Sequence, residues 1–210
     1  ATAHDTALDG LGGGGRNIDD DVALAEGETA VGEALQRLLE RPDARLDRDV
    51  ELADGRAGDE PGGHQSDATL VHAYGDPWVI EGQGSAGIEI AAQMTTRGLE
   101  GPTRIVACCG GGGLTAGLAL ACPEAEIVPV EPEGWDDVKR SLETGEIQRV
   151  AKDAPPTDCD ALQTPATWPI NFAILKERCA YGLVVTPAEV RAAQRFAFSR
   201  LHLVLEPGGA

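Results

Sequence analysis

A run of four glycines is the feature of this sequence that most directly predicts chemistry. Gly110, Gly111, Gly112 and Gly113 precede Leu114 and lie between a predicted buried strand and a predicted helix. Glycines let backbone N–H groups turn toward an anion, and the start of the next helix adds positive potential. The run therefore predicts a phosphate-binding loop, with an ordinary flexible turn as the alternative.

The neighbouring residues narrow the choice of phosphate ligand. The glycines are not followed by the Lys-Ser or Lys-Thr ending of a nucleoside triphosphate loop. They also lack the G-x-G-x-x-G spacing of a dinucleotide site. A nucleoside triphosphate is therefore disfavoured, and a dinucleotide fits less well than a simpler phosphorylated ligand.

The elements that must position this loop follow the pattern of an α/β protein. From residue 67 onward, short apolar runs alternate with amphipathic ones, which predicts an open, mainly parallel sheet with flanking helices. Ser85 is the expected N-cap of one helix, and Thr186 is expected to cap the last helix together with Glu189. The expected strands are 68–71, 103–109 and 126–131, and the expected helices are 85–95, 114–121, 136–142 and 187–201.

Residues 1–66 differ in composition from residues 67–210. The first part contains no aromatic residue, Met, Cys or Lys, and it is rich in Gly, Asp and Arg. Only residues 28–40 form an apolar stripe at helical spacing, through Val31, Leu35, Leu38 and Leu39. We therefore divide the chain into an atypical segment, 1–66, and a phosphate-binding portion, 67–210.

The overall charge excludes two classes of partner. Against 17 Lys and Arg residues stand 35 Asp and Glu residues, a net charge of -18, which argues against binding to nucleic acid or to an anionic membrane. No apolar stretch is long enough to span a bilayer, and no secretory signal is recognisable. Five cysteines without a C-x-x-C pair predict reduced, buried thiols. These features predict a cytoplasmic protein.

Five blocks of sequence in the same order resemble fold-type II pyridoxal-phosphate enzymes, in the branch of threonine/serine dehydratase, serine racemase and hydroxyaspartate ammonia-lyase. The resemblance covers residues 67–210. The blocks are 70–85 (with LVHAYGDP and VIEGQGS), 110–114 (GGGGL), 131–142 (EPEGWDD, then SL), 158–165 (DCDALQTP) and 203–210 (LVLEPGGA).

The resemblance implies a cofactor and a reaction. In these enzymes a lysine holds pyridoxal phosphate, and the cofactor ring takes up the electrons released when the substrate loses its α-proton. Loss of the β-hydroxyl from L-threonine, L-serine or another 3-hydroxy amino acid then gives a 2-keto acid and ammonia. By the same resemblance, residues 110–114 bind the cofactor phosphate through their backbone.

A cation site is also implied by the resemblance. In the racemase and dehydratase branch, the positions of Glu131 and Asp137, together with the carbonyl of Trp135, bind Mg²⁺ or Ca²⁺. Oxygen ligands suit such hard cations. The alternative is structural, with Asp136 and Asp137 capping a helix and Glu131 ending a strand.

The sequence departs from the family at the centre of its chemistry. The family lysine lies upstream of the glycine loop, but the three lysines here, Lys139, Lys152 and Lys176, all follow it. The substrate-binding SSGNHxQ loop and the SGGN element have no counterpart, and Ala161 replaces a glycine. The catalytic residue is therefore unassigned.

Several interpretations of the whole chain stay open. It is a dehydratase-like enzyme acting on a small amino acid, a non-catalytic module that binds pyridoxal phosphate or another phosphorylated ligand, or an inactive fragment. For residues 1–66, the alternatives are a divergent segment, foreign sequence, or a shifted reading frame. Association of identical chains is also left open.

Overall fold

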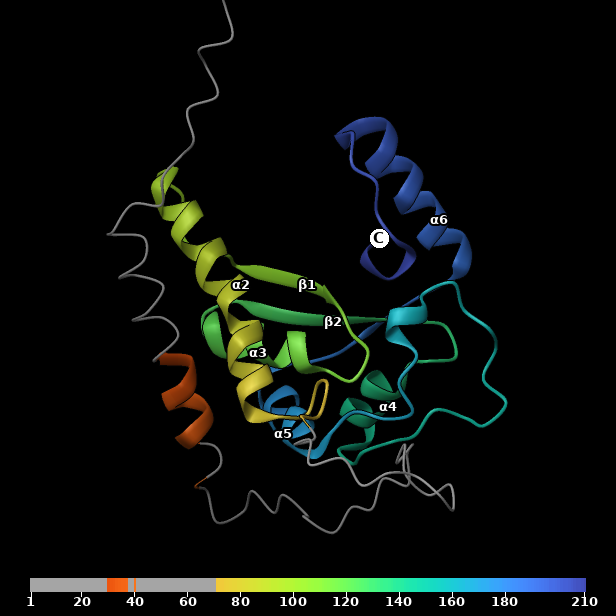
Figure 1. Cartoon of the computed structure of the whole chain (residues 1–210), viewed down its shortest axis with the longest axis horizontal. Helices are drawn as coiled ribbons and strands as arrows, with labels where there is room; N and C mark the ends of the chain where they lie inside the picture. Colours follow the sequence, from red (N-terminus) through yellow and green to blue (C-terminus); the bar gives the residue numbers. More distant parts are fainter. Residues whose placement is uncertain (1–29, 38–39, 41–70) are drawn as a thin grey trace, which may run out of the picture.

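The computed structural model describes residues 30–37, 40 and 71–210, which form helices around a small sheet (Figure 1). Residues 30–37 are helical, as predicted for this part of 28–40, and Val31 and Leu35 are buried. Leu38 and Leu39 lie outside the described residues, as do residues 68–70 of the first expected strand. Val71, the last residue of that expected strand, is not in a strand.

The sheet has three parallel strands in the order β1-β2-β3. Strand β1 spans Arg104–Cys108, β2 spans Glu126–Pro132 and β3 spans Leu183–Val185. The predicted α/β class with a parallel sheet is therefore confirmed. Strand β3 was not predicted, because three residues are too few to show a periodic pattern.

Helix α2 spans Pro77–Thr96 and begins earlier than predicted. The side chain of Asp76 accepts a hydrogen bond from the backbone N of Trp78 at 2.8 Å, and Pro77 occupies the first turn, where its missing N–H costs nothing. Ser85 lies inside the helix, and its hydroxyl donates to the carbonyl of Gly82. The prediction that Ser85 caps the helix is therefore wrong: the stronger Asp-Pro start signal lies upstream.

The other helices flank the sheet (Figure 1). Helix α3 spans Gly113–Ala121, α4 spans Asp137–Thr144, α5 spans Pro169–Arg178 and α6 spans Pro187–Phe196. The predicted capping box of Thr186 and Glu189 at the start of α6 is present. The expected last helix continues over Ala197–Leu201 as a π-helix, and α5 was not predicted.

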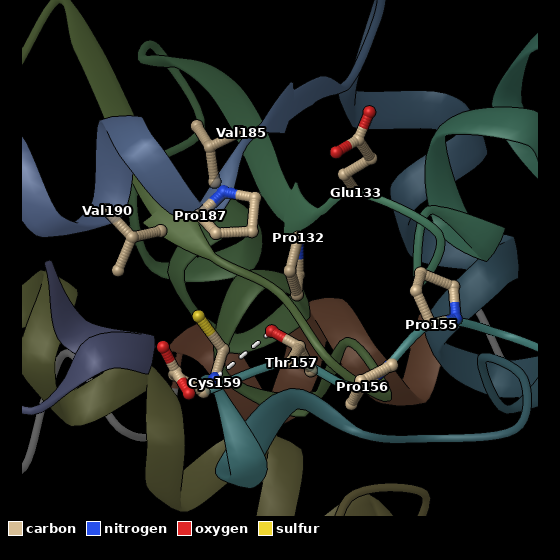
Figure 2. Close-up of a pocket in the computed structure, with 10 residues that line it drawn as sticks. Pro132, Glu133, Pro155, Pro156, Thr157, Cys159, Val185, Pro187 and Val190 are labelled. Carbon is tan, nitrogen blue, oxygen red and sulfur yellow. Dashed lines mark hydrogen bonds between the residues drawn. The ribbon is translucent and has the colours of Figure 1, made fainter.

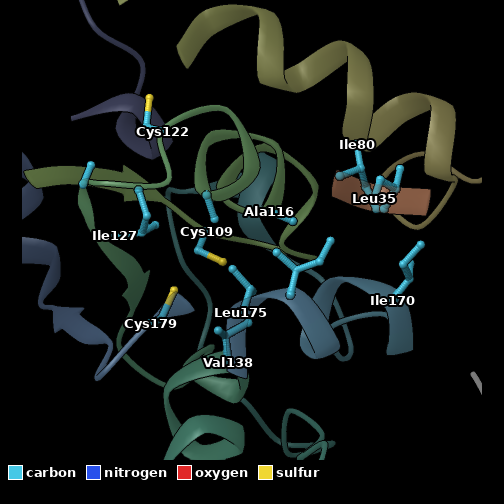
Figure 3. Close-up of a cluster of buried hydrophobic side chains, with 13 residues drawn as sticks. Leu35, Ile80, Cys109, Ala116, Cys122, Ile127, Val138, Ile170, Leu175 and Cys179 are labelled. Atoms are coloured by element: carbon cyan, nitrogen blue, oxygen red, sulfur yellow. The ribbon is translucent and has the colours of Figure 1, made fainter. Parts of the chain in front are cut away.

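The core lies between α3, α5 and one face of the sheet, as Figure 3 shows for Cys109, Ile127 and Leu175. Helices α2 and α3 cross so closely that a Cβ at Gly117 would lie 2.6 Å from the carbonyl oxygen of Ile80. Only glycine permits this approach, and it fixes the helix that follows the glycine loop against α2. Among the described residues, no helix is long and apolar enough to cross a membrane.

Candidate functional site: the glycine loop

The glycine loop connects the end of β1 to the start of α3, as predicted. Gly112 is the N-cap of α3, with a φ of 91° and no side-chain cap. The backbone N of Ala116 donates to the carbonyl of Gly112 at 2.8 Å, so the N–H groups of residues 113–115 have no acceptor within the helix. Unpaired N–H groups at a helix start form a receptor for an anion.

Two buried polar side chains hold the loop in place. The Nδ2 of Asn171 donates to the carbonyl oxygens of Gly111, at 2.7 Å, and of Tyr74, at 2.9 Å. The hydroxyl of Thr167 donates to the same carbonyl of Gly111 at 3.1 Å. Both side chains are almost completely buried. The loop is therefore fixed from inside the protein through the carbonyl group of Gly111.

Close packing explains why the loop consists of glycines. A Cβ at Gly111 would lie 2.1 Å from the ring of Tyr74, and one at Gly113 would lie 2.9 Å from the carbonyl oxygen of Tyr74. At Gly112 the positive φ alone disfavours any side chain. Tyr74 thus packs directly on the loop.

The segment that carries Tyr74 is itself anchored by a hydrogen bond and by contacts between aromatic rings. The Nδ1 of His72 accepts a hydrogen bond from the backbone N of Gly75 at 2.9 Å. Its ring lies 3.9 Å from that of Trp168, centroid to centroid, and meets Tyr74 edge-on. The contacts of His72, a residue of the first of the five sequence blocks, are therefore structural.

Two buried carboxylates connect α4 to the same network. Glu131, at the end of β2, accepts hydrogen bonds from the backbone N of Val138 at 2.8 Å and of Lys139 at 2.7 Å, which anchors the first turn of α4. Asp137 accepts one from the backbone N of Thr167 at 2.8 Å. Burial raises the pKa of Glu131 to about 8 and that of Asp137 to about 7. Thr167 thus links Asp137 to the glycine loop.

Trp135, the third residue of the predicted cation site, is oriented by a hydrogen bond from its indole ring. The indole N–H of Trp135 donates to the carbonyl of Pro155 at 2.8 Å. Within the part of the chain that the structure describes, no three His, Cys, Asp or Glu side chains are grouped closely enough to hold a metal. A cation at this place would therefore depend on two carboxylates and on backbone carbonyls.

Sequence patterns did not indicate Asn171 and Thr167. Asn171 lies among apolar residues of α5, and a polar residue at a fully buried position is the signal that could have identified it once α5 was recognised. Thr167 lies in the segment just before that helix. Neither position belongs to one of the five blocks.

Two of the three lysines form an ion pair or a hydrogen bond on the protein surface. The ammonium group of Lys139 pairs with Glu143 in the same helix at 2.6 Å. That of Lys176 donates to the carbonyl of Gly145 at 2.8 Å, and Lys152 is exposed. None of these contacts is with the glycine loop.

A small cavity beside the end of β2 is too small for a cofactor. Figure 2 shows its lining, in which Pro132, Pro155, Pro156 and Pro187 surround a volume of about 60 Å³. The backbone N of Cys159 donates to the hydroxyl of Thr157 at its edge. Sites for small molecules usually measure several hundred Å³.

Comparison with known proteins identifies the family. The profile of a family described as pyridoxal-phosphate dependent enzymes matches residues 28–210. The chain belongs to this family. The predicted resemblance is thereby confirmed, and the match begins upstream of residue 67, so that it includes the helical residues 30–37.

Curated relatives place the chain more closely within the family. It is 33% identical over 150 residues to the serine racemase of Dictyostelium discoideum, which covers 70% of this chain and 44% of the relative. It is 35% identical to the L-threo-3-hydroxyaspartate ammonia-lyase of a Pseudomonas species, covering 69% and 44%. The chain thus spans less than half the length of these relatives.

Solved structures agree with this placement. A threonine deaminase from T.th. is 42% identical and has a TM-score of 0.62, with 66% of this chain and 52% of that chain covered. The serine racemase of Dictyostelium discoideum has a TM-score of 0.59 at 32% identity, covering 67% and 44%. Both support the fold-type II assignment.

Proposed function

We propose that this chain forms the phosphate-binding part of a pyridoxal-phosphate enzyme that dehydrates and deaminates a 3-hydroxy amino acid. The substrate would be L-threonine, L-serine or a related amino acid, and the products a 2-keto acid and ammonia. Family membership supports the cofactor, and the similarity to threonine, serine and hydroxyaspartate enzymes supports the substrate class. The single observation that carries the proposal is that the N–H groups of residues 113–115, at the start of α3, have no acceptor within the helix.

The described residues fit a phosphate group. Residues 110–114 contain no acidic side chain, and the N–H groups of residues 113–115 have no helical acceptor. In this proposal, Gly110 to Gly113 and Leu114 hold the phosphate, and Asn171 and Thr167 keep the loop in its binding conformation. Bound pyridoxal phosphate supplies an acceptor for the electrons left when the substrate loses its α-proton.

Equilibrium dialysis of the full chain with pyridoxal phosphate tests the loop. Gly112→Ala should weaken binding about tenfold or more, because the alanine disfavours a φ of 91° and its Cβ would crowd Leu175 and Thr167 at 3.1 to 3.2 Å. Gly98→Ala is the matched control: Gly98 also has a positive φ, 70°, but open space around it. Pyridoxal without its phosphate should bind more weakly than the cofactor. Equal affinity of both variants and the unchanged chain, or no binding at all, would contradict the proposal.

A non-catalytic binding module is the second candidate. The partners of Lys139 and Lys176 and the exposure of Lys152 favour it, since none of the three lysines contacts the glycine loop. Borohydride treatment followed by peptide mapping separates the two candidates. Covalent fixation of the cofactor on one lysine, together with keto acid formation from serine or threonine, supports the enzyme; reversible binding without fixation supports the module.

We also propose that Glu131, Asp137 and the carbonyl of Trp135 bind Mg²⁺ or Ca²⁺. Support comes from the donor types, two buried carboxylates and a carbonyl, which are those that hard cations prefer. Thermal unfolding measured with and without about 5 mM Ca²⁺ checks this, since a cation that binds the folded chain raises its Tm. Asp137→Asn should abolish the rise, whereas Asp153→Asn, at an exposed site, should not.

Two further predictions from the sequence accompany this proposal. A cytoplasmic location agrees with the five free cysteines, four of them buried. Association of identical chains is a separate hypothesis, which sedimentation of the purified chain would test.

A further inference from the structure

Thr167 connects two buried parts of the protein that lie far apart in the sequence. Its backbone N donates to the carboxylate of Asp137, in the first turn of α4, at 2.8 Å. Its hydroxyl donates to the carbonyl of Gly111, in the glycine loop, at 3.1 Å. Thr167 and Asp137 are each 1% exposed, so both hydrogen bonds lie in the interior, where they are stronger than in water. Thr167 is therefore a fixed link between α4 and the loop.

The α4 end of this link is anchored on the sheet and in the core. Glu131, at the end of β2, accepts hydrogen bonds from the backbone N of Val138 and of Lys139. The side chain of Val138 is completely buried and lies beside Leu175 of α5 (Figure 3). Asp137 directly precedes these residues, so its position is set by β2 and α5 rather than by the loop.

The loop end of the link is a single peptide group. The carbonyl of Gly111 accepts hydrogen bonds from Thr167 and, at 2.7 Å, from the Nδ2 of Asn171. Because this peptide is planar and trans, the N–H of Gly112 points away from the two donors. Among the residues that the structure describes, this N–H has no hydrogen-bond acceptor. Two donors on the carbonyl also polarise the peptide, which makes its N–H a stronger donor.

We propose that Thr167 is a positioning residue for phosphate binding, and that Asp137 acts on the phosphate site through it. In this inference, which rests on the proposed function, Thr167 and Asn171 hold the Gly111–Gly112 peptide so that the N–H of Gly112 is presented to the phosphate. Asp137 holds the backbone of Thr167 and thereby keeps its hydroxyl within reach of Gly111. The link consists of protein groups alone and requires no cation.

Three threonine variants of the full chain test the hydroxyl by equilibrium dialysis with pyridoxal phosphate, in buffer with a chelator so that no divalent cation takes part. Thr167→Val keeps the shape of the side chain but removes the donor, and it should weaken binding about tenfold. Thr167→Ser keeps the donor and should bind within about threefold of the unchanged chain. Thr164→Val is the matched control and should not alter binding, because the hydroxyl oxygen of Thr164 is also buried but has no partner.

A second ligand separates positioning from general damage. Pyridoxal, which lacks the phosphate, should bind with the same affinity, within about twofold, to the unchanged chain and to all three variants, because the Gly112 N–H contacts only the phosphate in this inference. The Tm of each variant without ligand shows that it is folded.

A double substitution tests the role of Asp137. Asp137→Ala removes the acceptor for the backbone N of Thr167 and should weaken pyridoxal phosphate binding about threefold or more, whereas Asp137→Asn keeps an oxygen acceptor and should retain most of the affinity. If Asp137 acts through Thr167, the variant carrying both Asp137→Ala and Thr167→Val should bind no more weakly than Thr167→Val alone.

The outcomes distinguish this inference from the proposed function. Absence of pyridoxal phosphate binding by the unchanged chain overturns the proposed function and the inference with it. Binding by the unchanged chain that Thr167→Val leaves intact, or that Thr167→Ser weakens equally, overturns the inference alone. So does an equal loss of affinity for pyridoxal. Additive losses in the double variant overturn the part played by Asp137.

Discussion

The two sides of β1 differ in how completely the protein has buried them. The adjacent cysteines at its end show this directly: Cys109 is 1% exposed in the core, whereas Cys108 is partly exposed and lines a cavity of about 620 Å³. On the core side, Asn171 and Thr167 hold the glycine loop through buried hydrogen bonds. The difference teaches that the described residues bury one face of the sheet in their own core and leave a cavity along the other face.

The largest difference in stability between the two sides is expected when one polar side chain is removed from each. Asn171→Ala removes the donor to the carbonyls of Gly111 and Tyr74 and should lower the free energy of unfolding by about 3 kcal/mol, because two carbonyls lose a donor in the interior. Gln194→Ala removes one bond to the carbonyl of Leu205 beside α6, at a partly exposed site, and should cost no more than about 1 kcal/mol. Urea unfolding measures both. Equal losses would show that the two sides are held with similar strength.

The next largest difference is expected between two valines that are in register on the same face of the sheet. Val106 of β1 lies opposite Val128 of β2, but Val128 is 1% exposed and Val106 58%. Val128→Ala should lower the free energy of unfolding by about 2 kcal/mol through lost burial, and Val106→Ala should change it by no more than about 0.5 kcal/mol. The same denaturation experiment checks this. A large loss for Val106→Ala would mean that Val106 is buried in the isolated chain.

The smallest effect concerns the rate at which the cysteines react. Burial raises the pKa of Cys108 above its ordinary value, that of Cys109 well above it, and that of Cys179 to about 12. Since the thiolate is the reactive form, alkylation of Cys108 should be slow at about pH 7.5. Its rate should increase about tenfold for each unit by which the pH is raised, until the pH reaches the pKa of the thiol. Mass spectrometry of the native chain should find Cys108 modified and Cys109 unmodified. Faster modification of Cys109 would reverse the assignment of the two sides.

Part of the site could be predicted because its signal is local. Four consecutive glycines between a strand and a helix specify a loop without side chains, and the structure places that loop at the start of α3. The capping box at α6 was predictable for the same reason, since Thr186 and Glu189 are only three residues apart. The start of α2 was placed wrongly at Ser85, although Asp76 and Pro77 carry a local signal that is at least as strong.

The residues that hold the loop could not be predicted from local patterns. Asn171 is 60 residues from Gly111, and Thr167 is 56 residues from it. Only the packing of α5 against α3, together with the segment just before α5, brings these side chains under the loop. Nothing in the sequence near Asn171 indicates that its amide has two carbonyl partners.

The sequence by itself determined the class of fold, the family and the position of the glycine loop, because strand and helix periods, glycine runs and ordered blocks are properties of neighbouring residues. The tertiary structure alone decided which side chains hold that loop and which side of β1 stays open. Burial and hydrogen bonding between distant segments depend on where helices such as α5 and α6 come to lie, and a linear pattern does not contain that information.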